Sequence, residues 1–248
     1  GRTNVEVTEP FWFRDEFSED SLGRYIYPAG RFVYDSVGSR LECSGKTGNI
    51  ELPSAKLKDV ILETKWTPYQ YGASGRLLGL IIIADQSIEP STSSPNLSGN
   101  KYLIYLRCDE SAKSIDIMRT INGSTVSIRT GRGTFAPAFG TTYKLKVDFD
   151  PERETEQIRL YIVEDGSEYT ELPTLVATDT TYTNGYTGLA YYNNDSSGAI
   201  QYFDDLQISG TRVYQKPIHR GAMLETYHDG TQEVVGTTFI DDCQWDRS

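Results

Sequence analysis

Apolar and polar residues alternate along most of this 248-residue chain. Alternation with period two is typical of a β-strand that buries one face. No segment of useful length has a helical period. The chain therefore reads as an all-β protein, with expected strands at 31–37, 40–45, 60–66, 101–108, 114–120, 125–130, 143–150, 157–165, 188–194 and 199–209.

The segments between these strands are short and rich in Gly, Asn, Asp, Ser and Pro. Examples are "SGKTGN" at 44–49, "INGS" at 121–124 and "VEDGSE" at 163–168. These residue types favour tight turns, which join antiparallel neighbours. Ten or more short strands with such turns predict a single antiparallel β-sandwich of the jelly-roll type.

The pattern changes after Gly210. The segment 211–248 contains both histidines and a hairpin-like stretch in which Asp229-Gly230 is a favourable turn. We therefore expect an N-terminal extension at 1–10, a sandwich at 11–210, and a C-terminal arm or hairpin at 211–248. Terminal arms often add a strand to the sheet edge of a neighbouring subunit, so the C-terminal arm suggests a homo-oligomer.

The charge of the chain limits its partners. The formal net charge is -11 and the sequence pI is about 4.7. Binding to nucleic acid needs a concentrated basic face, so a nucleic-acid partner is not expected. The longest apolar run, Leu77–Ala84, is much shorter than a membrane span and predicts a buried strand, so we expect no membrane insertion.

The cysteines give little further information. Cys43, Cys108 and Cys243 are an odd number, and none has the Cys-x-x-Cys spacing of a zinc or redox site. Their pairing and the redox compartment stay open.

Two motifs at opposite ends of the sandwich carry a family resemblance. They are "FWFRDEFSEDSLGRY" at 11–25 and "YFDDLQISG" at 202–210. Together with the order of the middle strands, they resemble the concanavalin-like jelly rolls, which include laminin-G-like domains, carbohydrate-binding modules and laminarinase-type glycosidases. The Trp that usually follows the first motif is missing, and Tyr25 or Tyr27 stands in its place.

This resemblance implies a structural calcium ion where the two terminal strands meet. Calcium prefers carboxylate and carbonyl oxygens. The resemblance places Asp15 and Glu16 at the first strand, with Glu16 contributing through its carbonyl, and Asp204 and Asp205 at the closing strand. The alternative is that these carboxylates are solvated strand ends.

The stretch "KSIDIMR" at 113–119 shares Ile-Asp-Ile with the catalytic strand of the resembling hydrolases. A retaining glycosidase needs two carboxylates, one as nucleophile and one as acid/base. The two glutamate positions are occupied here by Ser114 and by Met118 or Arg119, and only Asp116 remains. We therefore expect an ordinary strand and no enzyme activity, and a divergent polysaccharide hydrolase or lyase ranks third among the hypotheses.

The densest candidate for a sugar site is "KWTPYQYGASGR" at 65–76, with Trp66, Tyr69, Tyr71 and Arg76. Aromatic faces stack on the C–H groups of sugar rings, and polar side chains bind the hydroxyls. The alternative is that these aromatic residues fill the core of the sandwich.

These observations favour a non-catalytic module for glycan recognition or adhesion, in an extracellular or virion-surface setting. The alternative is a purely structural assembly protein, such as a phage capsid-decoration or tail protein. Its partners would then be other subunits of the assembly in place of a glycan.

Overall fold

The structure is a computed structural model of the 248-residue chain. It describes residues 2–25, 32–44, 47–51, 55–70, 76–85, 100–108, 113–130, 135–193, 200–226 and 232–240. For some of these, including 217–226 and 232–240, it describes the backbone alone. The expected turn at Asp229-Gly230 lies outside the described residues.

The chain divides into two compact units. One is Pro10–Arg212, and the other combines Gly1–Glu9 with Val213–Ser248. The two terminal segments, expected from the sequence as separate extensions, belong to one unit.

Strands are the main secondary structure of the described residues, which also contain one short 3-10 helix, η1 (Leu22–Arg24). The strands are β1 (Arg2–Asp15), β2 (Phe32–Asp35), β3 (Arg40–Ser44), β4 (Thr47–Glu51), β5 (Leu57–Gln70), β6 (Arg76–Ala84), β7 (Lys101–Cys108), β8 (Lys113–Ile121), β9 (Ser124–Ser127), β10 (Tyr143–Phe149), β11 (Ile158–Glu164), β12 (Leu175–Ala177), β13 (Tyr186–Asn193), β14 (Ile200–Thr226) and β15 (Gln232–Ile240).

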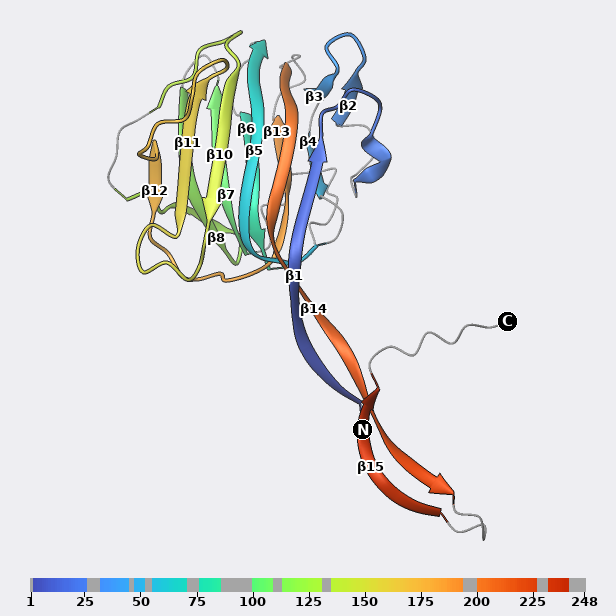
Figure 1. Ribbon diagram of the computed structural model, residues 1–248. Helices are drawn as coiled ribbons and strands as arrows, with labels where there is room; N and C mark the ends of the chain where they lie inside the picture. Colours follow the sequence, from blue (N-terminus) through green and yellow to red (C-terminus); the bar gives the residue numbers. More distant parts are fainter. Residues whose placement is uncertain are drawn as a thin grey trace. The chain divides into compact units, whose positions relative to one another are not determined.

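In the described part of the chain these strands form two antiparallel sheets. The first follows the order β12-β11-β10-β5-β14-β3-β2, with β1 and β15 also paired to β14. The second follows the order β4-β13-β6-β7-β8-β9. Figure 1 shows them as two facing layers, with β10, β5 and β14 in front of β6, β7 and β8. This arrangement is the predicted jelly-roll sandwich.

Strand alternation explains how the two layers hold together. Along β10 the residues from Tyr143 to Phe149 are alternately buried and half-buried, and the same pattern runs along β11. The buried faces of both sheets meet in one apolar core. Its largest fully buried side chains are Trp66, Tyr102, Phe17, Phe32, Phe149 and Phe203. Burial of this apolar area is the main favourable contribution to folding.

Strand β14 does not end where the sequence suggested. It continues through Gly210 to Thr226 and pairs with β15 from His219↔Ile240 to Thr226↔Gln232. A Cβ at Gly210 would lie 2.1 Å from the carbonyl oxygen of Asp59, so glycine is required there for close packing against the backbone. The glycine marks close packing of the backbone and not the end of a strand.

In the part of the chain that the structure describes, no helix has the length and apolar character needed to cross a membrane.

Candidate functional site

The loop that follows β1 is built around Asp15, which is only 4% exposed. Its carboxylate accepts hydrogen bonds from the backbone N–H of Phe17 (2.9 Å), the hydroxyl of Ser21 (2.5 Å) and the hydroxyl of Tyr25 (2.8 Å). A carboxylate that is removed from water is stabilised when its lone pairs are filled in this way. Asp15 therefore fixes the path of residues 16–25 against the end of the strand.

Packing between aromatic rings also holds this loop in place. Phe17 is buried with a left-handed φ of 48°, and its ring is stacked on that of Tyr25 at 6.3 Å. Phe13 meets Tyr25 edge to face at 5.7 Å. Burial, and after it the hydrogen bond to Asp15, raises the pKa of Tyr25, so its hydroxyl stays protonated and keeps donating.

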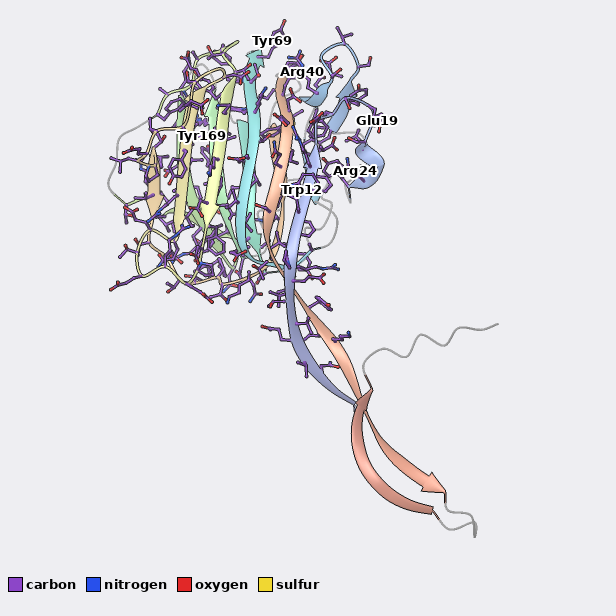
Figure 2. All side chains as sticks on the ribbon, in the orientation of Figure 1. Trp12, Glu19, Arg24, Arg40, Tyr69 and Tyr169 are labelled. Carbon is purple, nitrogen blue, oxygen red and sulfur yellow. The ribbon has the colours of Figure 1, made fainter. Side chains whose placement is uncertain are left out.

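Residues of β1 and of this loop line a hollow of about 250 Å³. One of its walls is the side chain of Trp12, which is 68% exposed. Figure 2 shows Trp12 on β1 and Arg24 and Glu19 on the loop that follows. The hollow is lined by the exposed Trp12, Arg14, Glu16, Ser18, Glu19 and Arg24, and by the buried Asp15 and Ser21. We call it the β1 hollow.

Trp12 lies in the motif at 11–25 but was not predicted as a ligand-binding residue. Strand alternation was the signal that could have found it, because "FWF" places Phe11 and Phe13 on one face and Trp12 on the other. Phe13 is buried and Phe11 packs on the core, so Trp12 faces the solvent.

Both arginines of the hollow are engaged by the protein. Arg14 contacts the carboxylate of Glu16 at 2.6 Å and that of Asp205 at 3.5 Å. Arg24 donates to the carbonyl of Arg14 (3.1 Å), lies 3.5 Å from the carboxylate of Asp15, and stands over the ring of Phe13 at 4.7 Å. Both guanidinium groups therefore connect residues that line the hollow to neighbouring residues of the protein.

Glu19 and Ser18 differ from the arginines. Among the described residues, none forms a hydrogen bond or ion pair with the Glu19 carboxylate, the Ser18 hydroxyl or the Trp12 indole N–H. These groups leave the hollow with an aromatic face, a carboxylate and a hydroxyl that a ligand can use.

The carboxylates of the four residues expected to bind calcium all have protein partners. The Asp15 carboxylate is filled by protein donors, and the Arg14 guanidinium bridges Glu16 and Asp205, where a cation would otherwise balance them. The remaining carboxylate, Asp204, accepts from the backbone N–H of Asp205 at 2.8 Å, and burial raises its pKa. Within the described stretches, no three His, Cys, Asp or Glu residues are grouped as metal ligands.

The predicted aromatic cluster is divided between the core and the surface. Trp66 is fully buried, and its indole N–H donates to the side-chain oxygen of Gln201 at 2.8 Å. Its ring lies beside Tyr143, with the ring centres 6.0 Å apart. A ring enclosed in this way cannot stack on a sugar, so Trp66 is a core residue and not part of a ligand site.

Tyr69, in contrast, is 53% exposed and meets the ring of Tyr202 edge to face at 5.4 Å. The guanidinium of Arg40 covers Tyr202 at 3.3 Å from its ring centre. Figure 2 labels Tyr69 and Arg40, which stand apart from Trp12. Tyr71 and the side chain of Arg76 lie outside the described residues.

The stretch "KSIDIMR" lies in β8. Alternation places Ser114, Asp116 and Met118 on one face of this strand, opposite the buried Ile115 and Ile117. The Asp116 carboxylate accepts a hydrogen bond of 2.9 Å from the Ser127 hydroxyl. A single carboxylate tied to the neighbouring strand does not provide the two that a retaining glycosidase requires.

No family model matches this chain, and sequence comparison with curated proteins found no match. Solved structures do match its fold. The winged bean acidic lectin, complexed with methyl-α-D-galactose, is 11% identical with a TM-score of 0.58, over 83% of this chain and 100% of the lectin. A Bacillus subtilis protein of unknown function with a galectin-like fold is 14% identical with a TM-score of 0.57, over 81% of this chain and 96% of that one.

The carbohydrate-binding module CBM66 from Bacillus subtilis is 17% identical with a TM-score of 0.50, over 74% of this chain and 94% of the module. At these identities the likeness concerns the backbone alone. The chain has the concanavalin-like jelly-roll fold that lectins and carbohydrate-binding modules share.

Proposed function

We propose that the Pro10–Arg212 unit is a non-catalytic glycan-binding module and that the β1 hollow is its sugar site. The observation that carries this proposal is the indole of Trp12, exposed for 68% of its surface at the wall of a polar hollow. Large aromatic side chains are costly to leave in water, and an exposed one beside a concave polar surface is typical of a binding site.

The chemistry of the β1 hollow suits a sugar. The electron-rich face of an indole attracts the polarised C–H groups of a pyranose ring. Glu19 and Ser18 offer oxygens to sugar hydroxyls, and Asp15 holds the loop in place before a ligand arrives. The volume of about 250 Å³ is below the roughly 300–1,000 Å³ of sites for drug-sized ligands, so one sugar residue is the expected occupant.

The fold gives independent support, because two of the matched structures are named a lectin and a carbohydrate-binding module. Function does not follow from fold, so the site must carry the argument. An extracellular or virion-surface setting, and the absence of catalysis, are part of the proposal.

Two variants test where sugar binds. Glycan-array screening of the full chain would identify a binding sugar, and calorimetric titration would measure its affinity for the wild type, Trp12→Ala and Tyr69→Ala. Tyr69→Ala is the matched control, because it also removes an exposed aromatic ring from the surface. We expect Trp12→Ala to weaken binding by about tenfold or more, equivalent to about 1.4 kcal/mol, and Tyr69→Ala to leave it unchanged.

Other results would contradict the proposal. If Tyr69→Ala abolishes binding and Trp12→Ala does not, the sugar site lies beside Tyr202 and Arg40 and not in the β1 hollow. If no glycan binds to the wild type at all, the module is not a lectin.

A structural assembly protein is the second candidate, and one observation favours it. Among the described side chains of the terminal unit, at 4–9 and 213–216, only Val213 is buried. These described side chains form no core, and a ribbon of a few strands is marginally stable in water, so this unit would gain stability from a second copy of the chain. The proposed assembly role thus belongs to the terminal unit, and the proposed glycan-binding role belongs to the sandwich.

Light scattering of the full chain tests assembly. Val5→Lys places a charge on the β1 segment of the terminal unit, and Val37→Lys places one in an exposed turn of the sandwich. Assembly through the terminal unit predicts an oligomer that Val5→Lys dissociates and Val37→Lys does not. A monomeric wild type at every concentration would rule it out.

A further inference from the structure

The proposed glycan site also carries information about the charge of its ligand. The side chains around the β1 hollow include three carboxylates, Asp15, Glu16 and Glu19, against two guanidinium groups, Arg14 and Arg24. Both guanidinium groups are held by protein carboxylates at 2.6 to 3.5 Å. Positive charge in the hollow is therefore already matched by negative charge of the protein itself.

Glu19 supplies charge that is not matched. Its side chain is exposed, and among the described residues it has no hydrogen-bond or ion-pair partner. The Trp12 indole lines the same hollow. An indole face and a carboxylate both bind an ammonium ion, the first through its quadrupole and the second through charge-assisted hydrogen bonds.

We infer that the β1 hollow prefers a sugar with a protonated amine, a hexosamine whose nitrogen is not acylated. The ring C–H groups lie on the Trp12 indole and the ammonium group donates to Glu19. Neutral sugars bind more weakly, and sugars with a carboxylate are repelled by Glu19 and by the protein's net charge of -11. This inference rests on the proposed function, because it names the ligand class of the same hollow.

Three matched probes test the inference on the full chain at pH 6. They are oligomers of glucosamine, of N-acetylglucosamine and of glucuronic acid, each titrated into the wild type, Trp12→Ala, Glu19→Gln and Glu171→Gln. Glu171 is an exposed glutamate outside the β1 hollow, so Glu171→Gln is the control for the change in net charge.

We expect the wild type to bind the glucosamine oligomer about tenfold more tightly than the N-acetyl oligomer, because only the free amine forms a charge-assisted hydrogen bond with Glu19. Tenfold corresponds to about 1.4 kcal/mol. Glu19→Gln should remove that difference, because it weakens binding of the glucosamine oligomer more than binding of the N-acetyl oligomer. Trp12→Ala should weaken both, and Glu171→Gln neither.

The outcomes separate this inference from the function on which it rests. Equal affinity for the two hexosamine oligomers, both lost in Trp12→Ala, would overturn the amine preference and leave a glycan site. Tighter binding of the glucuronic acid oligomer would also overturn it. Competition by n-butylamine as strong as that by the glucosamine oligomer would show an ammonium site without sugar recognition, and no binding of any glycan would refute the proposed function itself.

Discussion

The hydroxyl of Tyr25 donates a 2.8 Å hydrogen bond to the carboxylate of Asp15, ten residues before it in the sequence. This contact closes the loop that forms the β1 hollow, and both side chains are buried. The position and rigidity of the proposed site therefore depend on a polar contact that is shielded from water.

Removing this contact should loosen the loop. Tyr25→Phe leaves one lone pair of the buried Asp15 carboxylate unfilled, and we expect the free energy of unfolding to fall by about 2 kcal/mol. Urea denaturation of the two proteins would measure it. Tyr34→Phe is a suitable control, because Tyr34 is a partly buried tyrosine packed on the core elsewhere in the sandwich. Equal stability of Tyr25→Phe and the wild type would show that the Tyr25 hydroxyl does not help to hold the loop.

The two aromatic residues of the segment 65–76 should respond to truncation in opposite ways. Trp66→Ala leaves a large cavity and removes the hydrogen-bond donor to the Gln201 side chain. We therefore expect the free energy of unfolding to fall by about 3–5 kcal/mol. Tyr69→Ala removes a mostly exposed ring and its edge contact with Tyr202. We expect the free energy of unfolding to fall by less than about 1 kcal/mol. Thermal and chemical denaturation would compare them, and similar losses would mean that Tyr69 is also a core residue.

Asp179 makes stability depend on acidic pH. Burial alone would raise the pKa of Asp179, but hydrogen bonds from Thr181 and Tyr102 and the charge of Arg119 more than offset burial, and its pKa is lowered. A lowered pKa in the folded state stabilises the fold above the ordinary Asp pKa of about 3.9, and this contribution disappears as the pH falls through the folded-state pKa.

The variant Asp179→Asn should thus be less stable than the wild type at pH 7, and the difference should narrow below about pH 4. Denaturation at a series of pH values would measure it. A difference that is constant with pH would show that the charge of Asp179 contributes nothing.

Lys101 has the corresponding effect at alkaline pH. It is 5% exposed, and burial lowers its pKa to about 8 while the nearby Asp85 partly offsets that shift. Between about pH 8 and the ordinary lysine pKa of about 10.4, the unfolded chain binds more protons than the folded one, so stability rises with pH. We expect the wild type to gain stability relative to Lys101→Met over this range, and a flat difference would contradict the pKa shift.

Calcium removal gives a direct test of the terminal-strand carboxylates. Arg14 bridges the carboxylates of Glu16 and Asp205, and the Asp15 carboxylate accepts its hydrogen bonds from the protein. We therefore expect the melting temperature to be the same in EDTA and in millimolar Ca²⁺. Differential scanning calorimetry would measure it, with Mg²⁺ as the ionic-strength control. A rise in Tm specific to Ca²⁺ would contradict this expectation and show that the chain binds calcium.

The sequence predicted the sandwich well because strands with one buried face leave a plain pattern. The predicted strands 143–150 and 157–165 correspond to β10 and β11 within one residue at each end. The end of β14 was misplaced at Gly210, since a glycine in a sequence marks either a turn or a close approach. The second case depends on Asp59, which lies 151 residues away in the sequence.

The candidate site was predicted less well for a different physical reason. Residue type favoured Trp66, but pairing with Tyr143 and Phe203 across the sheet fixes its face toward the core. The resemblance led to Asp15 and Glu16, which do lie at the proposed site. Their roles were set by Arg14 and Tyr25, whose contacts depend on the folded loop and cannot be read from spacing.

The opposite surroundings of Trp12 and Trp66 give this protein two optical probes. An indole in water emits at longer wavelength than one in an apolar core and is quenched by dissolved iodide, which cannot reach the core. With Trp245, which lies outside the described residues, replaced by phenylalanine, the long-wavelength and quenchable part of the emission would come from Trp12 in the β1 hollow. Ligand binding and unfolding could thus be followed separately in one unlabelled sample, by shielding of the first indole and exposure of the second.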